Sequence, residues 1–225
     1  MTCIALIHAL VHSIEPVNRA FKRDWPEAKL MNLLDDSLSR DLAEGSAGLD
    51  EAMYLRFERL AAYAVDNGAD AILFTCSAFG PCIESVAGIH SAIPVLKPNE
   101  AMIQDASRST GPLGLIATFA PTLQSMPSEF PSTVELRLRL AVGALEALNA
   151  GDYESHDRII SLHAKELAEG GCKTIALAQF SMARARRACE ASSGLPVLTT
   201  VDSAVQKIGE LLRSAAVRWR SISDG

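Results

Sequence analysis

The sequence contains 225 residues, of which 48% are hydrophobic and 21% are charged, and its formal net charge at neutral pH is −6. This composition is ordinary for a globular protein, and the length is sufficient for a core of one or two domains. The acidic balance gives no support for the clustered basic surface that nucleic-acid binding needs, and no apolar run approaches the ~20 residues that span a bilayer. We therefore expect no nucleic acid and no membrane among the partners.

The amino-terminal segment is apolar, but it lacks both a basic leader and a small-residue cleavage site. The five cysteines are odd in number and have no metal-type spacing: Cys3, Cys76, Cys82, Cys172 and Cys189. An odd set of thiols without an export signal is typical of a reduced compartment. These features predict a soluble, cytoplasmic protein.

Short apolar segments bounded by glycine or proline follow one another along the chain, as strands covered on both faces of a parallel sheet do. They lie at residues 3–8, 71–75, around Val95, and at 113–117, 174–178 and 197–199. Helical spacing of apolar residues predicts helices over 50–67, 134–150 and 156–169, with glycine after each. The basic stretch Arg184, Arg186 and Arg187 is interpreted as a solvated helix face. Alternating strands and helices predict an α/β fold.

The sequence repeats itself at a spacing of roughly one hundred residues. The segment from Gly68 to Cys76 aligns with the segment from Gly171 to Gln179, since in both a helix-ending glycine precedes an apolar strand and then small and polar residues. The period is too long for a solenoid and indicates a duplicated α/β half-domain. Chance similarity between two strand–helix units is the alternative.

The repeat directs attention to Cys76. In open α/β sheets ligands bind beyond the carboxyl ends of the strands, so two facing half-domains would place Cys76 and Gln179 in one cleft. A thiol where a strand ends and a helix begins experiences the helix dipole and free N–H groups, which lower its pKa. Those N–H groups can also hold a carboxylate, and Thr75 and Ser77 add hydroxyl donors. A simply buried cysteine is the alternative, and the repeat favours the functional interpretation.

Two further strand ends carry polar residues. His8 follows the first strand and could orient a substrate or act as an acid or base, or it could be a hydrogen-bonded structural histidine. Thr118 follows the strand at 113–117 and could donate to a carboxylate. The sequence has no glycine-rich phosphate loop, no Gly-x-Ser-x-Gly turn and no paired histidine ligands. We therefore expect neither a metal nor an organic cofactor.

In these motifs the chain resembles the aspartate/glutamate racemase superfamily, which includes hydantoin racemases, maleate isomerase and arylmalonate decarboxylase. The resemblance spans the chain and rests on four segments in order, residues 74–78, 114–119, 175–182 and 196–204. It implies two pseudo-symmetric half-domains, each a mainly parallel sheet flanked by helices, with the active site in the cleft between them. We expect residues 1–98 with a returning C-terminal helix at 205–225 to form one, residues 99–204 the other, and the protein to be a homo-oligomer.

The resemblance also implies a site in which two cysteines face each other and exchange a proton on the carbon beside a carboxyl. The first is Cys76, and the second falls at Gln179, where a glutamine cannot act as a general acid or base. Two-base racemisation is therefore not expected. The motifs supply the candidate substrate-binding residues: His8, Thr75, Ser77, Ala78, Thr118, Phe119, Gln179, Phe180 and Ser181.

The expected function is that of a cofactor-independent enzyme, racemase- or isomerase-like, which acts on a small carboxylate through the single thiolate of Cys76. Two alternatives remain open at this point. One is a lyase of the decarboxylase type, and the other is a non-catalytic protein of the same fold that binds a small acid.

Overall fold

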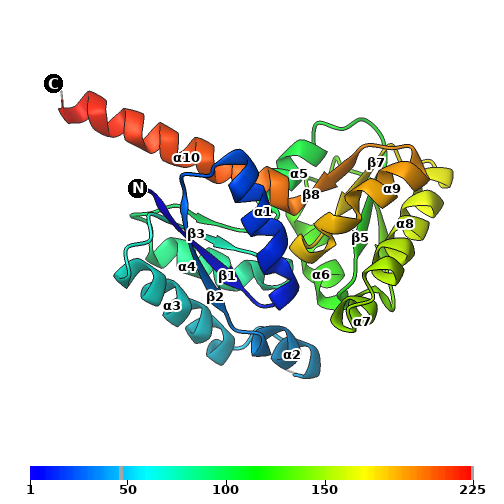
Figure 1. Cartoon of the computed structure of the whole chain (residues 1–225), viewed down its shortest axis with the longest axis horizontal. Helices are drawn as coiled ribbons and strands as arrows, with labels where there is room; N and C mark the ends of the chain where they lie inside the picture. The colour runs from blue at the N-terminus through cyan, green and yellow to red at the C-terminus, as the bar shows by residue number, and fades with distance from the viewer. Residues whose placement is uncertain (46–47, 224–225) are drawn as a thin grey trace.

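The computed structural model describes residues 1–45 and 48–223, with side-chain surroundings as far as Ser214. Two parallel four-stranded sheets follow one another along the chain (Figure 1). The first has the order β2-β1-β3-β4 and consists of β1 (Cys3–His8), β2 (Lys29–Leu34), β3 (Ala71–Phe74) and β4 (Val95–Leu96). The second repeats this order as β6-β5-β7-β8, with β5 (Leu113–Ala117), β6 (Leu136–Leu140), β7 (Thr174–Leu177) and β8 (Val197–Thr199). The predicted α/β fold with two half-domains is confirmed.

Helices cover both faces of the first sheet because its central strands are apolar on both sides. Alternate residues of β1 divide between two cores, so that Ile4 and Leu6 face one layer and Ala5 and Ile7 face the other. The first layer is α1 (Ile14–Asp24) with α10 (Thr200–Ser223), and the second is α3 (Glu51–Asp66) with α4 (Gly80–Ile89). Two short helices, η1 (Val11–Ser13) and α2 (Ser37–Glu44), follow β1 and β2.

The second sheet is covered in the same manner. On one face lie α8 (Tyr153–Glu169) and α9 (Arg186–Ser193), and on the other lie α5 (Glu100–Ala106) and η3 (Met126–Glu129). The remaining helices are η2 (Ser77–Phe79), α6 (Ala120–Ser125), α7 (Ala144–Asn149) and η4 (Phe180–Ala185). Four of the short helices, η1, η2, α6 and η4, directly follow the carboxyl ends of central strands.

The C-terminal helix joins the two half-domains. It begins at Thr200, directly after β8 of the second sheet, and runs back across the first half-domain (Figure 1). Val205 and Ile208 are buried there against Leu6 and Phe21. The half-domain boundaries at residues 98 and 204 stay predictions.

Matching glycines end the helices that lead into β3 and β7. Gly68 after α3 has a φ of 82°, and Gly171 after α8 has a φ of 94°. In both places the next residue donates its N–H to a carbonyl five residues back, from Ala69 to Ala64 and from Cys172 to Leu167. This is the hydrogen bond of a Schellman cap, and a left-handed conformation suits glycine because it has no Cβ. The sequence repeat therefore corresponds to a repeat of local structure.

The structure corrects one predicted helix, and it contains an edge strand that the sequence did not indicate. The helix predicted over residues 134–150 is wrong in its first half, which forms β6, and only α7 is helical. The sequence Leu-Arg-Leu-Arg-Leu of β6 has the period of two that belongs to an edge strand, and Gly143, at a φ of 84°, separates it from α7. The strand β2, at one edge of the first sheet, was not predicted, because its half-exposed side chains lack a continuous apolar run. None of the described helices combines the length and apolar character needed to span a bilayer.

Candidate active site

Cys76 and Gln179 occupy equivalent positions in the two half-domains. Each lies two residues beyond its strand, β3 or β7, and each is the residue that precedes a 3₁₀ helix, η2 or η4. Their backbones are extended in the same way, with φ and ψ of −120° and 120° at Cys76 and −135° and 145° at Gln179. The sequence alignment thus corresponds to a structural equivalence.

Side chains beside these two residues meet across the contact between the half-domains. Ser77 Oγ lies 3.3 Å from Thr122 Oγ1, which joins η2 of the first half-domain to α6 of the second. Phe119, at the start of α6, packs against the apolar cluster of the first half-domain to which Cys76 also belongs. On the other side, Thr118 is hydrogen-bonded to Gln179. The strand ends of both sheets therefore face one shared region.

The side-chain amide of Gln179 has a fixed orientation. Its Oε1 accepts the backbone N–H of Thr118 at 2.6 Å and the hydroxyl of Thr118 at 3.1 Å. A backbone N–H can only donate, so the atom facing it must be the oxygen. The Nε2 group is consequently directed away from Thr118 with its two N–H donors. Gln179 therefore offers hydrogen-bond donors where the repeat would otherwise offer a thiol.

The thiol of Cys76 is protonated at neutral pH. Burial raises its pKa to about 11, and this effect outweighs hydrogen bonds from the Ala78 backbone and from Ser39, which act in the opposite direction. The prediction that the following helix lowers this pKa is therefore wrong, because burial is the larger effect. Cys76 is nevertheless the one cysteine of the five that is not fully buried.

His8 is a neutral, hydrogen-bonded residue beneath the site. It is completely buried, with Nδ1 2.9 Å from Thr75 Oγ1 and Nε2 2.9 Å from Asn32 Oδ1. Since the carbonyl of Asn32 only accepts, Nε2 carries the proton and Nδ1 accepts from the hydroxyl of Thr75. Burial lowers the pKa of His8 to about 4, against a partial opposing effect of Asn32. The geometry therefore favours the structural interpretation over acid–base work near pH 7.

The other predicted residues divide between the site and the core. Thr75, Ser77 and Ala78 are buried around Cys76. Phe180 inserts fully into the core of the first half-domain, so its role is packing rather than substrate contact. Ser181 is also buried, and its Oγ has no hydrogen-bond partner among the described residues.

Three residues near the site were not predicted: Asn32, Ser39 and Thr122. Each reaches it from an element that the sequence did not indicate, namely β2, α2 or α6. No motif marks them, because their proximity depends on how those elements pack.

Two cavities flank the contact between the half-domains. One, of about 870 Å³, lies between α1, η4 and α9, and the other, of about 680 Å³, lies between α4, α5 and η3. Cys76 is not among the residues that line either of them. Within residues 1–45 and 48–223, no group of three or more His, Cys, Asp or Glu side chains is arranged to hold a metal ion.

Comparisons with known proteins agree with this architecture. The family model described as Asp/Glu/hydantoin racemase matches residues 9–208. A glutamate racemase from Bacillus anthracis has a TM-score of 0.77 at 13% identity, covering 95% of this chain and 82% of that chain. A glutamate racemase from Francisella tularensis, solved with D-glutamate, has a TM-score of 0.74 at 14% identity, covering 96% and 82%.

An allantoin racemase from Klebsiella pneumoniae has a TM-score of 0.71 at 18% identity, covering 96% of this chain and 89% of that chain. At these identities the likeness is one of fold. No curated protein sequence matches this chain.

Proposed function

Because the chain belongs to the Asp/Glu/hydantoin racemase family, we propose that it is a cofactor-independent isomerase-type enzyme that acts on a small carboxylate through the single thiol of Cys76. The observation that carries this proposal is the pairing of positions after β3 and β7. One holds a thiol, and the other holds a glutamine amide whose donors are directed away from Thr118.

In this proposal Gln179 binds the substrate and transfers no proton. Its Nε2 donates to a carboxylate oxygen of the substrate, where negative charge accumulates once the neighbouring carbon loses a proton. A donor that is already oriented stabilises such an oxyanion without having to reorganise. The two hydrogen bonds from Thr118 to Oε1 supply that orientation.

Cys76 carries the proton transfer. Its thiolate removes the proton from the carbon beside the carboxylate, and the C–H electron pair moves into the enolate-like anion. The new S–H exchanges its proton with water and then returns a solvent proton to the same carbon, which regenerates the thiolate. One thiol serves one face of this planar intermediate. The expected result is exchange of the α-proton with solvent and retention of configuration, because Gln179, the residue proposed for the other face, cannot return a proton.

Proton exchange in heavy water tests this function. Each enantiomer of glutamate and of aspartate is incubated with the protein, with loss of the Cα–H signal followed by NMR and configuration by chiral chromatography. We expect exchange with retention for at least one of these compounds. Binding without exchange would identify the protein as a small-acid-binding member of the family and contradict the proposal.

Three variants assign the roles. Cys76→Ala should abolish exchange, whereas Cys82→Ala, which removes a thiol buried in the adjacent α4, should leave it unchanged. Gln179→Cys should gain measurable racemisation, since it places a second thiol at the equivalent position. Efficient racemisation by the unaltered protein would overturn the single-thiol mechanism and require another base.

The raised pKa of Cys76 favours a second candidate, a decarboxylase-type lyase. There the C–C bond to a carboxylate breaks, CO₂ leaves with neither proton nor electron pair, and the carbanion takes the thiol proton, which water then replaces. A thiol with a pKa of about 11 is in the required form at neutral pH.

The pH profile discriminates between the two candidates. Exchange needs the thiolate, so its rate should rise about tenfold per pH unit toward pH 11. Decarboxylation of an aryl- or alkylmalonate needs the thiol, so its rate should be flat through neutral pH and fall only near pH 11.

A further inference from the structure

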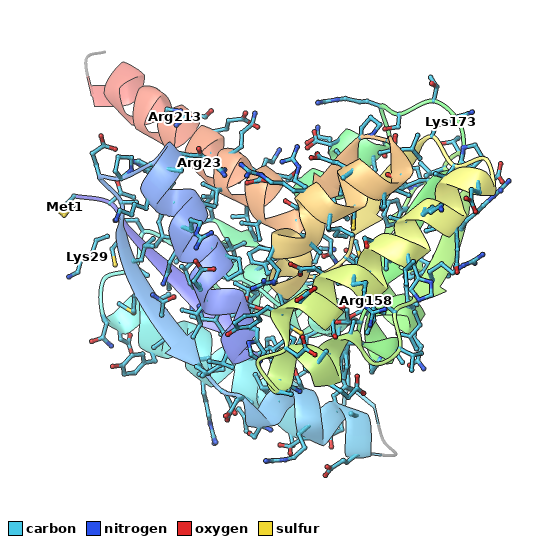
Figure 2. The ribbon with its side chains drawn as sticks, turned by 45° about the vertical axis from the view of Figure 1, so that its right-hand side comes forward. Met1, Arg23, Lys29, Arg158, Lys173 and Arg213 are labelled. Carbon is cyan, nitrogen blue, oxygen red and sulfur yellow. The ribbon has the colours of Figure 1, made fainter. Side chains whose placement is uncertain are left out.

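The larger cavity, of about 870 Å³, is rich in arginine. Its lining includes Arg19 and Arg23 on α1, Arg184 on η4, and Arg186 and Arg187 on α9. We refer to it as the arginine cavity. Arg23 lies on α1 beside α10 (Figure 2), and its guanidinium contacts Asp202 of α10 at 2.7 Å. The cavity therefore opens between the two half-domains, with cationic groups on both sides.

The charge of this lining contrasts with that of the whole chain. Five arginines and three acidic residues line the cavity, although the chain carries a net charge of −6. The three acids, Glu15, Glu190 and Asp202, each pair with an arginine of the lining. Arg187 has no ion-pair partner among the described residues and is exposed. A concentration of guanidinium groups in an acidic protein favours anions.

The cavity lining also includes a buried hydroxyl group that lacks a hydrogen-bond partner in the described part of the chain. Ser181 lines the arginine cavity, is 1% exposed, and has an Oγ without a hydrogen-bond partner among the described residues. Leaving a buried hydroxyl unpaired is costly, so a ligand acceptor that reaches it gains a hydrogen bond at no loss to the protein. This hydroxyl is independent of the charge pattern and belongs to a residue that lines the same cavity.

We propose that the arginine cavity binds a small polyanion that bridges the two half-domains. The protein already contains one such bridge, in which a carboxylate joins arginines of the two half-domains. The carboxylate of Asp202 accepts from Arg23 at 2.7 Å and from Arg186 at 3.1 Å. Guanidinium forks match carboxylate and phosphate oxygens, so either group suits the cavity. The ligand places one anionic group at Arg187 and an acceptor at Ser181.

This site is separate from the one around Cys76, and the two are linked through η4. Ser181 follows Gln179 by two residues on the same segment. An anion that holds Ser181 thus contacts η4, the helix that begins directly after Gln179, whereas the lining itself does not include Cys76.

Titration calorimetry with two probes tests the proposal. Citrate presents carboxylates and pyrophosphate presents phosphates. The probe that binds with the higher affinity defines the ligand class. Arg187→Gln should weaken the tighter probe about tenfold, the loss of one charge-assisted hydrogen bond, and Ser181→Ala should weaken it several-fold. Arg108→Gln is the matched control, since it removes the same charge from an exposed arginine outside the cavity and should change affinity less than twofold.

Three results would overturn the proposal. The first is an absence of binding by both probes at millimolar concentration. The second is equal weakening by Arg187→Gln and Arg108→Gln, which would mean a diffuse charge effect. The third is binding that is lost in Gln179→Ala and kept in Arg187→Gln, which would locate the anion beside Cys76 instead.

Discussion

The thiol of Cys76 is partly exposed to solvent and has a raised pKa. Exposure increases its reactivity toward reagents, whereas the raised pKa decreases it. Because the other four cysteines are buried, iodoacetamide should modify Cys76 first. Because its pKa is about 11, the rate should still rise about tenfold per pH unit beyond pH 9, where an ordinary thiol levels off. Peptide mapping by mass spectrometry over a pH series measures both properties. Faster labelling of Cys3, or a plateau below pH 9, would contradict this assignment.

His8 should make the stability of the protein fall in mild acid. Its pKa is about 4 in the folded chain and 6.5 in the unfolded chain, so the unfolded state binds the proton first as pH falls. The corresponding stability is complete above pH 6.5 and decreases toward pH 4, by about 3 kcal/mol at most. Urea denaturation between pH 7 and pH 4 would measure this slope.

The variant His8→Asn tests the origin of that slope. It should be less stable at pH 7, because Thr75 loses its acceptor, and it should show a clearly shallower pH dependence above pH 5. An unchanged slope would assign the acid sensitivity to other groups.

For single residues, the sequence predicted the place of a side chain in the fold better than it predicted the surroundings that set its pKa. The repeat placed Cys76 and Gln179 at matching strand ends, because glycine caps and apolar strands are local signals. It could not reveal the raised pKa of Cys76, which depends on the cluster around it, or the neutrality of His8, which depends on Asn32 in an unpredicted strand. Environment is set by tertiary packing, and a single sequence carries little of that information.

Strands that form short continuous apolar runs were predicted, whereas the two edge strands of mixed composition, β2 and β6, were missed or misassigned. The central strands β1, β3, β5 and β7 read as continuous apolar runs because helices cover them on both sides. The edge strands β2 and β6 are half-exposed and carry Lys, Asn or Arg among their apolar residues. Such mixed segments suit a helix nearly as well as a strand by composition, so the misassignment of β6 follows from its exposure.

Glycine in β5 allows α8 to lie close to the second sheet. A Cβ added at Gly114 would stand 2.8 Å from Leu167 Cδ1 and 2.9 Å from Ile175 Cδ1, and both of these side chains are buried. Gly114→Ala should therefore destabilise the protein by about 1–3 kcal/mol through overpacking. Gly88→Ala is the matched control, because a Cβ there meets nothing within 4 Å and replaces glycine in a helix.

Chemical denaturation of both variants decides the point. Gly88→Ala should be neutral or stabilising by up to about 1 kcal/mol. Equal effects of the two substitutions would show that backbone entropy, and not the contact between α8 and β5, governs the position of Gly114.

For the whole molecule, the two half-domains share a core although they are successive in sequence. Phe180 of η4 and Val205 of α10 both follow strands of the second sheet, yet both are buried with Leu6 of the first. Because these contacts break only when both half-domains open, the chain should unfold in a single transition. The same contacts hold the two half-domains together.

Ile208 provides the test of this coupling. It lies on α10 and is fully buried in the first half-domain's core, so Ile208→Ala should cost about 2–5 kcal/mol through the cavity it leaves. Hydrogen exchange should then show loss of protection in β1 and in β7 by the same amount, because the half-domains unfold together. Gln206→Ala, on the exposed face of the same helix, should leave both unchanged. Loss of protection confined to β1 would mean that the half-domains unfold independently, and that α10 secures only the one on which it packs.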